Sequence, residues 1–114
     1  NNGGEMWTAH GALSDKRTQL LEPTLVELKA PNQPAKKGHK EPPKVANTLV
    51  MFFRTDAGCI FKSVSYNKGL DWSPAEVINV PNPNTKFHAL RLMPGGMLAL
   101  VYNNHKRTQE CRAC

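Results

Sequence analysis

Ser65-Tyr66-Asn67-Lys68-Gly69-Leu70-Asp71-Trp72 reads as S-x-(D/N)-x-G-x-x-W, and this box occurs twice in the chain. The other copy, Asn2-Gly3-Gly4-Glu5-Met6-Trp7, keeps the spacing from Asn to Trp and lacks the serine position. The two tryptophans lie 65 residues apart (72 − 7). Similarity at a fixed period indicates a repeat architecture. This period suits a four-stranded propeller blade that carries an insertion.

The residue types of the box predict a tight turn between two strands. Asn67 has a short polar side chain that can hydrogen-bond the backbone ahead of it. Gly69 can adopt the positive φ that a side chain would resist. We expect Trp72 to fold its apolar face back over the turn.

Matching strands follow each box, so the chain is expected to be all-β. Each repeat offers a pair of apolar stretches, and Gly and Pro close the second pair into a hairpin through residues 93–96. The first pair is separated by a Pro- and Lys-rich stretch, 30–46, which we expect to be a flexible insertion. The predicted strands are Leu25–Leu28, Leu49–Arg54, Ile60–Val64, the region of Val77-Ile78, Ala89–Leu92 and Leu98–Asn103.

Antiparallel strand directions predict which polar residues share one rim of the blades. Glu22 stands just before the first strand, and Arg54 ends the second, so both should lie on the same rim. The turn made by the box falls on the opposite rim, and residues 79–86 cross to the next blade. By the pseudo-symmetry of the repeats, the rim collects six candidate residues: Glu22, Arg54, Asn82, Asn84, His88 and Asn103.

The order of these motifs resembles the sialidase (neuraminidase) superfamily with bacterial-neuraminidase repeats. The resemblance lies in Glu22–Leu28, in the strand that ends at Arg54, in the box, and in the run Val80–Thr85 with the strands after it. It implies a six-bladed β-propeller, of which residues 1–114 would be a partial domain of about two four-stranded blades. It also implies structural Asp-box roles for Asn2, Gly4, Trp7, Ser65, Asn67, Gly69 and Trp72.

The resemblance further implies a catalytic site on the shared rim. Arg54 matches the middle member of an arginine triad that holds the sugar carboxylate, which suits the planar guanidinium fork. Glu22 matches the glutamate that takes the proton from a nucleophilic tyrosine. Neither Tyr66, in the box, nor Tyr102, inside a predicted strand, suits that role. We therefore expect the nucleophile and the other arginines outside these 114 residues.

Simpler interpretations stand beside each of these assignments. A lone arginine at a strand end is usually a surface charge, and Glu22 could be a plain residue at the start of a strand. His88 could be a half-buried strand residue. Asn82, Asn84, His88 and Asn103 are candidates for substrate binding, to be weighed against these structural roles.

The remaining composition argues against other classes. The net charge of +6 rests largely on lysines in or beside 30–46 without interleaved aromatics, so no nucleic acid partner is expected. Cys111-x-x-Cys114 is a single pair, a weak metal signal, and we expect no metal and no cofactor. No membrane segment is apparent, and the compartment stays open.

Two functions follow from this sequence. The first is a glycoside hydrolase that removes terminal sialic acid or a related acidic sugar from a glycoconjugate. In that case these residues alone should be inactive, because the nucleophile is missing. The alternative is a non-catalytic carbohydrate-binding or scaffold propeller. The substrate sugar and its linkage remain open.

Overall fold

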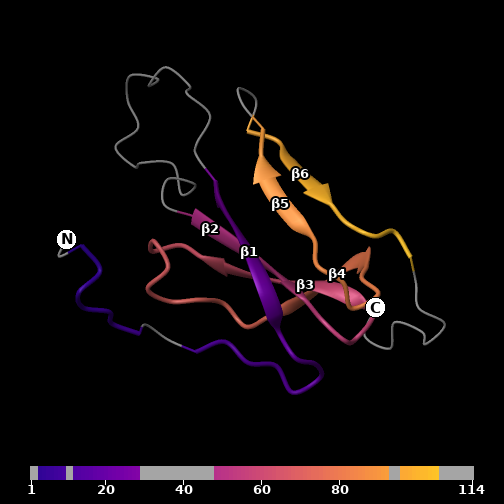
Figure 1. Cartoon of the computed structure of the whole chain (residues 1–114), viewed down its shortest axis with the longest axis horizontal. Helices are drawn as coiled ribbons and strands as arrows, with labels where there is room; N and C mark the ends of the chain where they lie inside the picture. Colours follow the sequence, from indigo (N-terminus) through magenta and orange to yellow (C-terminus); the bar gives the residue numbers. More distant parts are fainter. Residues whose placement is uncertain (1–2, 10–11, 29–47, 93–95, 106–114) are drawn as a thin grey trace, which may run out of the picture.

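The computed structural model describes residues 3–9, 12–28, 48–92 and 96–105, and its secondary structure consists of six strands. Four of them form one antiparallel sheet in chain order: β1 (Leu21–Leu28), β2 (Thr48–Arg54), β3 (Cys59–Ser65) and β4 (Glu76–Pro81). β5 (His88–Arg91) and β6 (Leu98–Val101) form a second, two-stranded sheet. β5 lies alongside β1, as Figure 1 shows.

Each predicted strand is present, with shifted ends. Glu22 lies inside β1 rather than before it, because a bulge between Leu21 and Thr24 lets the strand continue past Pro23. A proline lacks the N–H for a sheet ladder and is tolerated at bulges. β4 extends to Pro81, so the crossover begins at Asn82, later than predicted, and Tyr102 lies just after β6.

The described strands do not form a closed ring. The second sheet has two strands where a complete blade would have four. The insertion predicted at 30–46 lies outside the described residues. The strand residues on either side of it, Leu28 and Thr48, are direct partners in the β1–β2 ladder.

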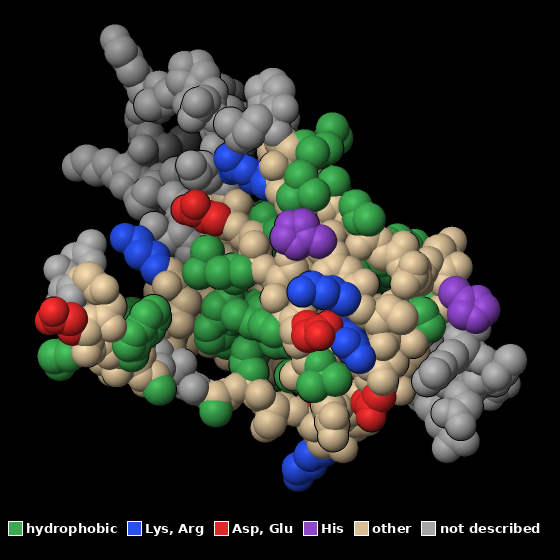
Figure 2. Space-filling view, viewed as in Figure 1, with side chains coloured by type: hydrophobic (Ala, Val, Ile, Leu, Met, Phe, Trp, Pro, Cys, Tyr) green, Lys and Arg blue, Asp and Glu red, His purple; other side chains and the backbone are tan. Residues whose placement is uncertain are grey.

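The two faces of the larger sheet are covered differently. On one face, Val26 pairs with Val50, and both side chains are buried. β5 packs beside β1, the strand that carries Val26. On the other face, Phe53 pairs with Phe61 at the centre of the main core cluster. Burying each of these phenylalanines contributes roughly 1.5–3 kcal/mol. Figure 2 shows apolar side chains gathered in the middle of the visible face.

The segment before β1 completes this core. Leu13 and Leu20 pack against the cluster that contains Phe53 and Phe61. Arg17 places its guanidinium carbon 4.9 Å from the centre of the Phe61 ring, in cation–π geometry.

The two boxes form the same turn. In the second, Trp72 Nε1 donates to Gly69 O at 3.1 Å, and in the first, Trp7 Nε1 donates to Gly4 O at 2.8 Å. Both glycines have φ of +88°. The positive φ predicted for Gly69 is therefore confirmed, and the first box repeats it at Gly4. Asn2 lies outside the described residues.

Further hydrogen bonds close the second box from within. Ser65 Oγ accepts from Gly69 N at 2.8 Å, and Asn67 Oδ1 accepts from Asp71 N at 2.9 Å. The predicted bond from Asn67 to the backbone ahead of it is thus confirmed. Such side-chain bonds to the backbone stabilise turns.

Candidate active site

The register of the first two strands brings Glu22 and Arg54 together. Arg54 is the last residue of β2 and pairs with Leu21, the residue before Glu22. Bulges bend a strand and re-aim its side chains. The bulge begins after Leu21, so it includes Glu22, whose side chain contacts Arg54.

Arg54 is held from two sides. Its Nη1 donates to Glu22 Oε2 at 2.8 Å, and its Nε donates to Asn84 Oδ1 at 2.9 Å. Asn84 comes from the loop after β4, so three separate segments meet at one guanidinium. The side chain of Arg54 is 26% exposed and that of Glu22 is 45% exposed, so the cluster is reachable from solvent.

Both partners of Arg54 have a positive φ, which strains the backbone of Glu22 and which Asn tolerates better. Glu22 has φ of +41° and Asn84 has φ of +59°. Lys68, in the second box, is the other non-glycine residue with positive φ in the described part of the chain. Residues held in sparsely populated conformations cluster at functional sites, where the surrounding structure enforces them.

The cluster keeps capacity for a ligand. A guanidinium has five N–H bonds, and the two contacts use one at Nε and one at Nη1. Among the described residues, Arg54 Nη2 and Glu22 Oε1 have no hydrogen-bond partner. A partly exposed guanidinium of this kind can bind a carboxylate, and the free carboxylate oxygen of Glu22 can accept a proton.

Asn82 lies in the predicted crossover loop, but its side chain has a structural environment. Its side chain is fully buried. Asn82 Nδ2 donates to Thr85 O at 2.9 Å, and Asn82 Oδ1 accepts from Thr85 N at 3.3 Å. Its own N–H donates to Gly58 O at 2.9 Å. Asn82 therefore builds the crossover loop, and its side chain does not face solvent on the rim.

Asn103 returns to the same loop. β6 ends at Val101, opposite His88 at the start of β5. Two residues later, the exposed Asn103 donates from Nδ2 to Thr85 Oγ1 at 2.9 Å. The strand-direction prediction therefore put Asn103 beside the loop that carries Asn84.

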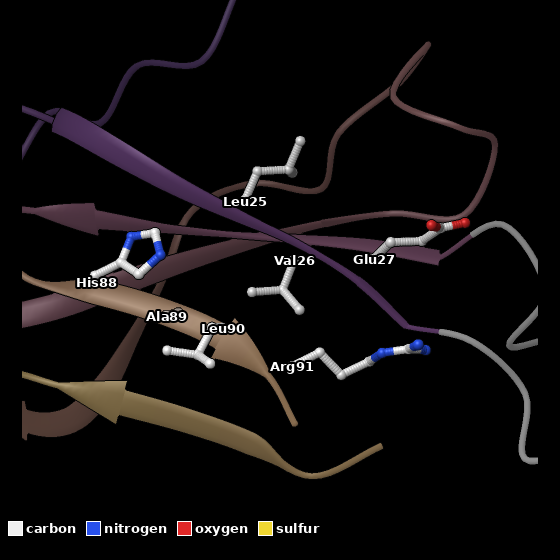
Figure 3. A pocket seen from close by; sticks show the side chains of 7 residues that line it. All are labelled: Leu25, Val26, Glu27, His88, Ala89, Leu90 and Arg91. Atoms are coloured by element: carbon white, nitrogen blue, oxygen red, sulfur yellow. The ribbon is translucent and has the colours of Figure 1, made fainter. Parts of the chain in front are cut away.

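His88 lies in an open groove between β1 and β5. Figure 3 shows its ring beside β1, and its Nδ1 is 3.3 Å from Thr24 Oγ1. The groove has a volume of about 350 Å³. Its lining comprises Leu25, Val26, Glu27, His88, Ala89, Leu90 and Arg91. His88 is the only one of the six predicted rim residues among them.

Thr24 was missed by sequence reasoning. It is buried, accepts from Ala89 N at 3.2 Å and lies 3.3 Å from Ala89 O. One hydroxyl thus joins the two sheets beside the bulge. Nothing in the local sequence marks this role, because the partner lies 65 residues away.

Asp15 and Arg17 were also missed. Asp15 Oδ2 pairs with Arg17 Nη2 at 2.6 Å, and the same nitrogen donates to Ala75 O at 3.1 Å. The side-chain hydrogen bond from Arg17 lowers the pKa of Asp15 from 3.8 to about 2. This pair fastens the segment before β1 to the large sheet.

Asp56 fixes the same segment near the β2–β3 hairpin. Its Oδ1 accepts from the Thr18 hydroxyl and, at 3.2 Å, from Gln19 N. The hydrogen bond from Thr18, followed by that from Gln19, lowers the pKa of Asp56. These contacts position the start of β1, and with it the bulge at Glu22.

Two further features of the described part of the chain concern metal ions and membranes. No group of three His, Cys, Asp or Glu side chains there could hold a metal ion. Cys111 and Cys114 lie outside it. No helix in the described ranges is long and apolar enough to cross a membrane.

Comparison with known proteins places this geometry in a family. The model of the BNR repeat-like domain matches residues 1–113. The chain belongs to the BNR repeat-like domain family. No curated protein matches it.

A solved structure supports the same fold. The chain is similar to a mutant of NanB sialidase from Streptococcus pneumoniae, with a TM-score of 0.64 and 20% identity. The match covers 92% of this chain and 15% of that chain. At this identity the likeness shows a shared fold, and this chain spans about 15% of the length of the matched sialidase.

Proposed function

We propose that this BNR chain contributes part of the active site of a sialidase-like glycosidase. In this proposal β1–β4 form one blade of a six-bladed propeller and β5–β6 begin the next. The two boxes act as its Asp-box turns. The substrate is a glycoconjugate that ends in sialic acid or a related acidic sugar.

One observation carries the proposal: Glu22 and Arg54 meet at 2.8 Å on a solvent-reachable rim. A guanidinium beside a carboxylate could also be a structural ion pair. However, the strained backbone at Glu22 would be an unneeded cost for a surface pair, which contributes about 0–1 kcal/mol.

Each residue then has a defined task. Arg54 binds the sugar carboxylate through its remaining N–H groups. Glu22 Oε1 accepts the proton of a tyrosine that another part of the protein supplies. As Glu22 takes the proton, the tyrosine oxygen bonds the anomeric carbon and the glycosidic bond to the aglycone breaks. An acid from another part of the protein protonates the departing aglycone oxygen, and water then hydrolyses the sugar–tyrosine bond. A tyrosine that is neutral until this step avoids repulsion by the anionic sugar.

Substitution of Glu22 by Gln tests the catalytic part. In the full-length protein, Glu22→Gln should lower kcat for a fluorogenic sialoside by about 10²–10⁴-fold, because the base is lost. Binding of the unsaturated sialic acid analogue should change little. Lys62→Gln, which breaks the Lys62–Glu76 pair on β3 and β4, is the matched control and should leave kcat unchanged.

The same assay separates the alternative function. Wild-type protein that binds the analogue but hydrolyses no sialoside would indicate a non-catalytic carbohydrate-binding propeller. Equal kcat for Glu22→Gln and wild type would contradict the role of Glu22 as base.

A further inference from the structure

Asn84 touches the candidate site through Arg54. Its Oδ1 accepts the Nε–H of Arg54 at 2.9 Å. The Nε–H lies near the pivot of the guanidinium plane, so a bond there fixes the direction of the whole fork. The Nη1 bond to Glu22 supplies a second fixed point.

The loop that carries Asn84 is anchored before any ligand arrives. The buried Asn82 binds Thr85 on one side of Asn84, and its N–H binds Gly58 in the β2–β3 hairpin. Arg54 ends the strand that leads into this hairpin. The hydrogen bonds that anchor this loop therefore position both Arg54, which donates the Nε bond, and Asn84, which accepts it.

The backbone of Asn84 identifies the residue types that can do this. Its φ of +59° lies in the left-handed region, which Asn, Asp and Gly tolerate best. Of these, Asn and Asp offer a side-chain acceptor. Asn provides it without adding a negative charge beside a site for an anionic group.

We propose that Asn84 is a positioning residue that acts on an acidic ligand only through Arg54, by holding its Nε. This rests on the proposed function of Arg54 and refines the earlier assignment of Asn84 to direct substrate binding. The competing possibility is that Asn84 Nδ2, which has no partner among the described residues, contacts the sugar itself.

A measurement on the free protein tests the hold without any sugar. Full-length protein labelled with ¹⁵Nε-arginine gives an Arg54 Nε–H signal, assigned by its loss in Arg54→Lys. We expect Asn84→Gly, which keeps the positive φ, to speed exchange of this proton by roughly tenfold, as suits loss of a charge-assisted hydrogen bond. Asn84→Asp should keep exchange slow. Equal exchange in Asn84→Gly and wild type would overturn the proposal.

A double-mutant cycle then tests whether Asn84 acts only through Arg54. We expect Asn84→Gly to weaken binding of the unsaturated sialic acid analogue about tenfold with Arg54 present. In the Arg54→Lys background, which has no Nε, the same change should have no further effect. Additive losses would overturn the proposal, because they would mean that Asn84 contacts the sugar directly.

The two readouts separate this inference from the proposed function. Suppose that the Arg54 Nε–H proton exchanges fast in Asn84→Gly but the protein binds no acidic sugar. This result would support the positioning of Arg54 by Asn84 and reject the sialidase-like function. Unchanged melting temperature in Asn84→Gly confirms that the loop itself is intact.

Discussion

Arg54 is where strain and polar contacts converge at the scale of single residues. Its partners Glu22 and Asn84 both have positive φ, a conformation that costs a residue such as Glu roughly 1–2 kcal/mol and that Asn tolerates better. This cost must be met by the sheet and loop around them. We infer that the protein retains this cost because these residues serve the site, and a variant without the strain tests this.

Replacing Glu22 by Gly should relieve the strain at the site. We expect the free energy of unfolding of the full-length protein to rise by about 0–1 kcal/mol, since relief of φ is partly offset by the entropy of glycine and the lost ion pair. Sialoside turnover should disappear. Thermal and denaturant unfolding measure the first, and a fluorogenic assay measures the second.

Lys68→Gly is the matched control, because Lys68 has φ of +62° in the box, away from Arg54. It should bring a similar change in stability with unchanged turnover. A large loss of stability in Glu22→Gly alone would show that the ion pair, rather than catalysis, maintains the strained backbone.

The Asp15–Arg17 pair predicts a dependence of stability on pH. The pKa of Asp15 is lowered to about 2 in the folded protein. Its contribution is therefore fully present above the unfolded value near 3.8 and is lost as pH falls through about 2. Asp15→Asn should lower the melting temperature by about 1–3 °C at pH 7.

This difference between wild type and Asp15→Asn should shrink as the pH approaches about 2. Melting curves of both proteins between neutral and acid pH measure it. A difference that stays constant over this range would mean that Asp15 acts through packing rather than charge.

At the scale of elements, the pairing of β1 with β2 shows how short the connection between these strands could be. Its ladder is regular from Thr24 to Leu28, so Leu28 and Thr48 are adjacent strand partners. Partners in neighbouring antiparallel strands are about 4.5–5.5 Å apart. A short turn is therefore enough to join these two strands.

Deleting residues 31–44 should leave the hairpin intact. Five residues would remain between Leu28 and Thr48, a length that suits hairpin loops. Loop-closure entropy predicts a free energy of unfolding unchanged or higher by about 1 kcal/mol. Turnover should also persist, because Glu22 and Arg54 lie at the other end of these strands.

Unfolding curves and the sialoside assay on the deletion variant measure both effects. A version with the segment replaced by a Gly/Ser sequence of equal length controls for loop length. Loss of turnover in both variants would mean that the deleted segment takes part in the site.

The elements show why part of this fold was predictable. Alternating apolar residues, turn glycines and the repeated box are local signals, and they located all six strands to within a few residues. The bulge at Pro23 was not predicted, because proline usually marks a strand boundary. Asn82 was placed on the rim by loop position, whereas the loop buries it to satisfy its own backbone.

The polar contacts between distant segments were harder to predict. Glu22 and Arg54 could be placed on one rim from strand direction alone, since each lies near the end of a strand. The bonds of Thr24 to Ala89 and of Arg17 to Ala75 depend on how the segments pack. Such contacts leave no periodic trace in the sequence.

At the scale of the whole molecule, the chain is a BNR repeat-like segment that covers 15% of the matched sialidase. Its described surface carries apolar side chains at the second sheet, where Met97 and Val101 are each 68% exposed. In our proposal, further blades cover this surface and supply the tyrosine and the other arginines. The site then depends on the complete ring.

Binding of the unsaturated sialic acid analogue by the full-length protein tests the central claim most directly. Calorimetric titration compares wild type with Arg54→Lys, which keeps the charge but loses the planar fork. The account predicts a Kd higher by about tenfold or more in Arg54→Lys, from loss of a charge-assisted bond of roughly 1.5–3 kcal/mol, with nearly the same melting temperature. An equal Kd for the two proteins would remove Arg54 from the site and contradict the account.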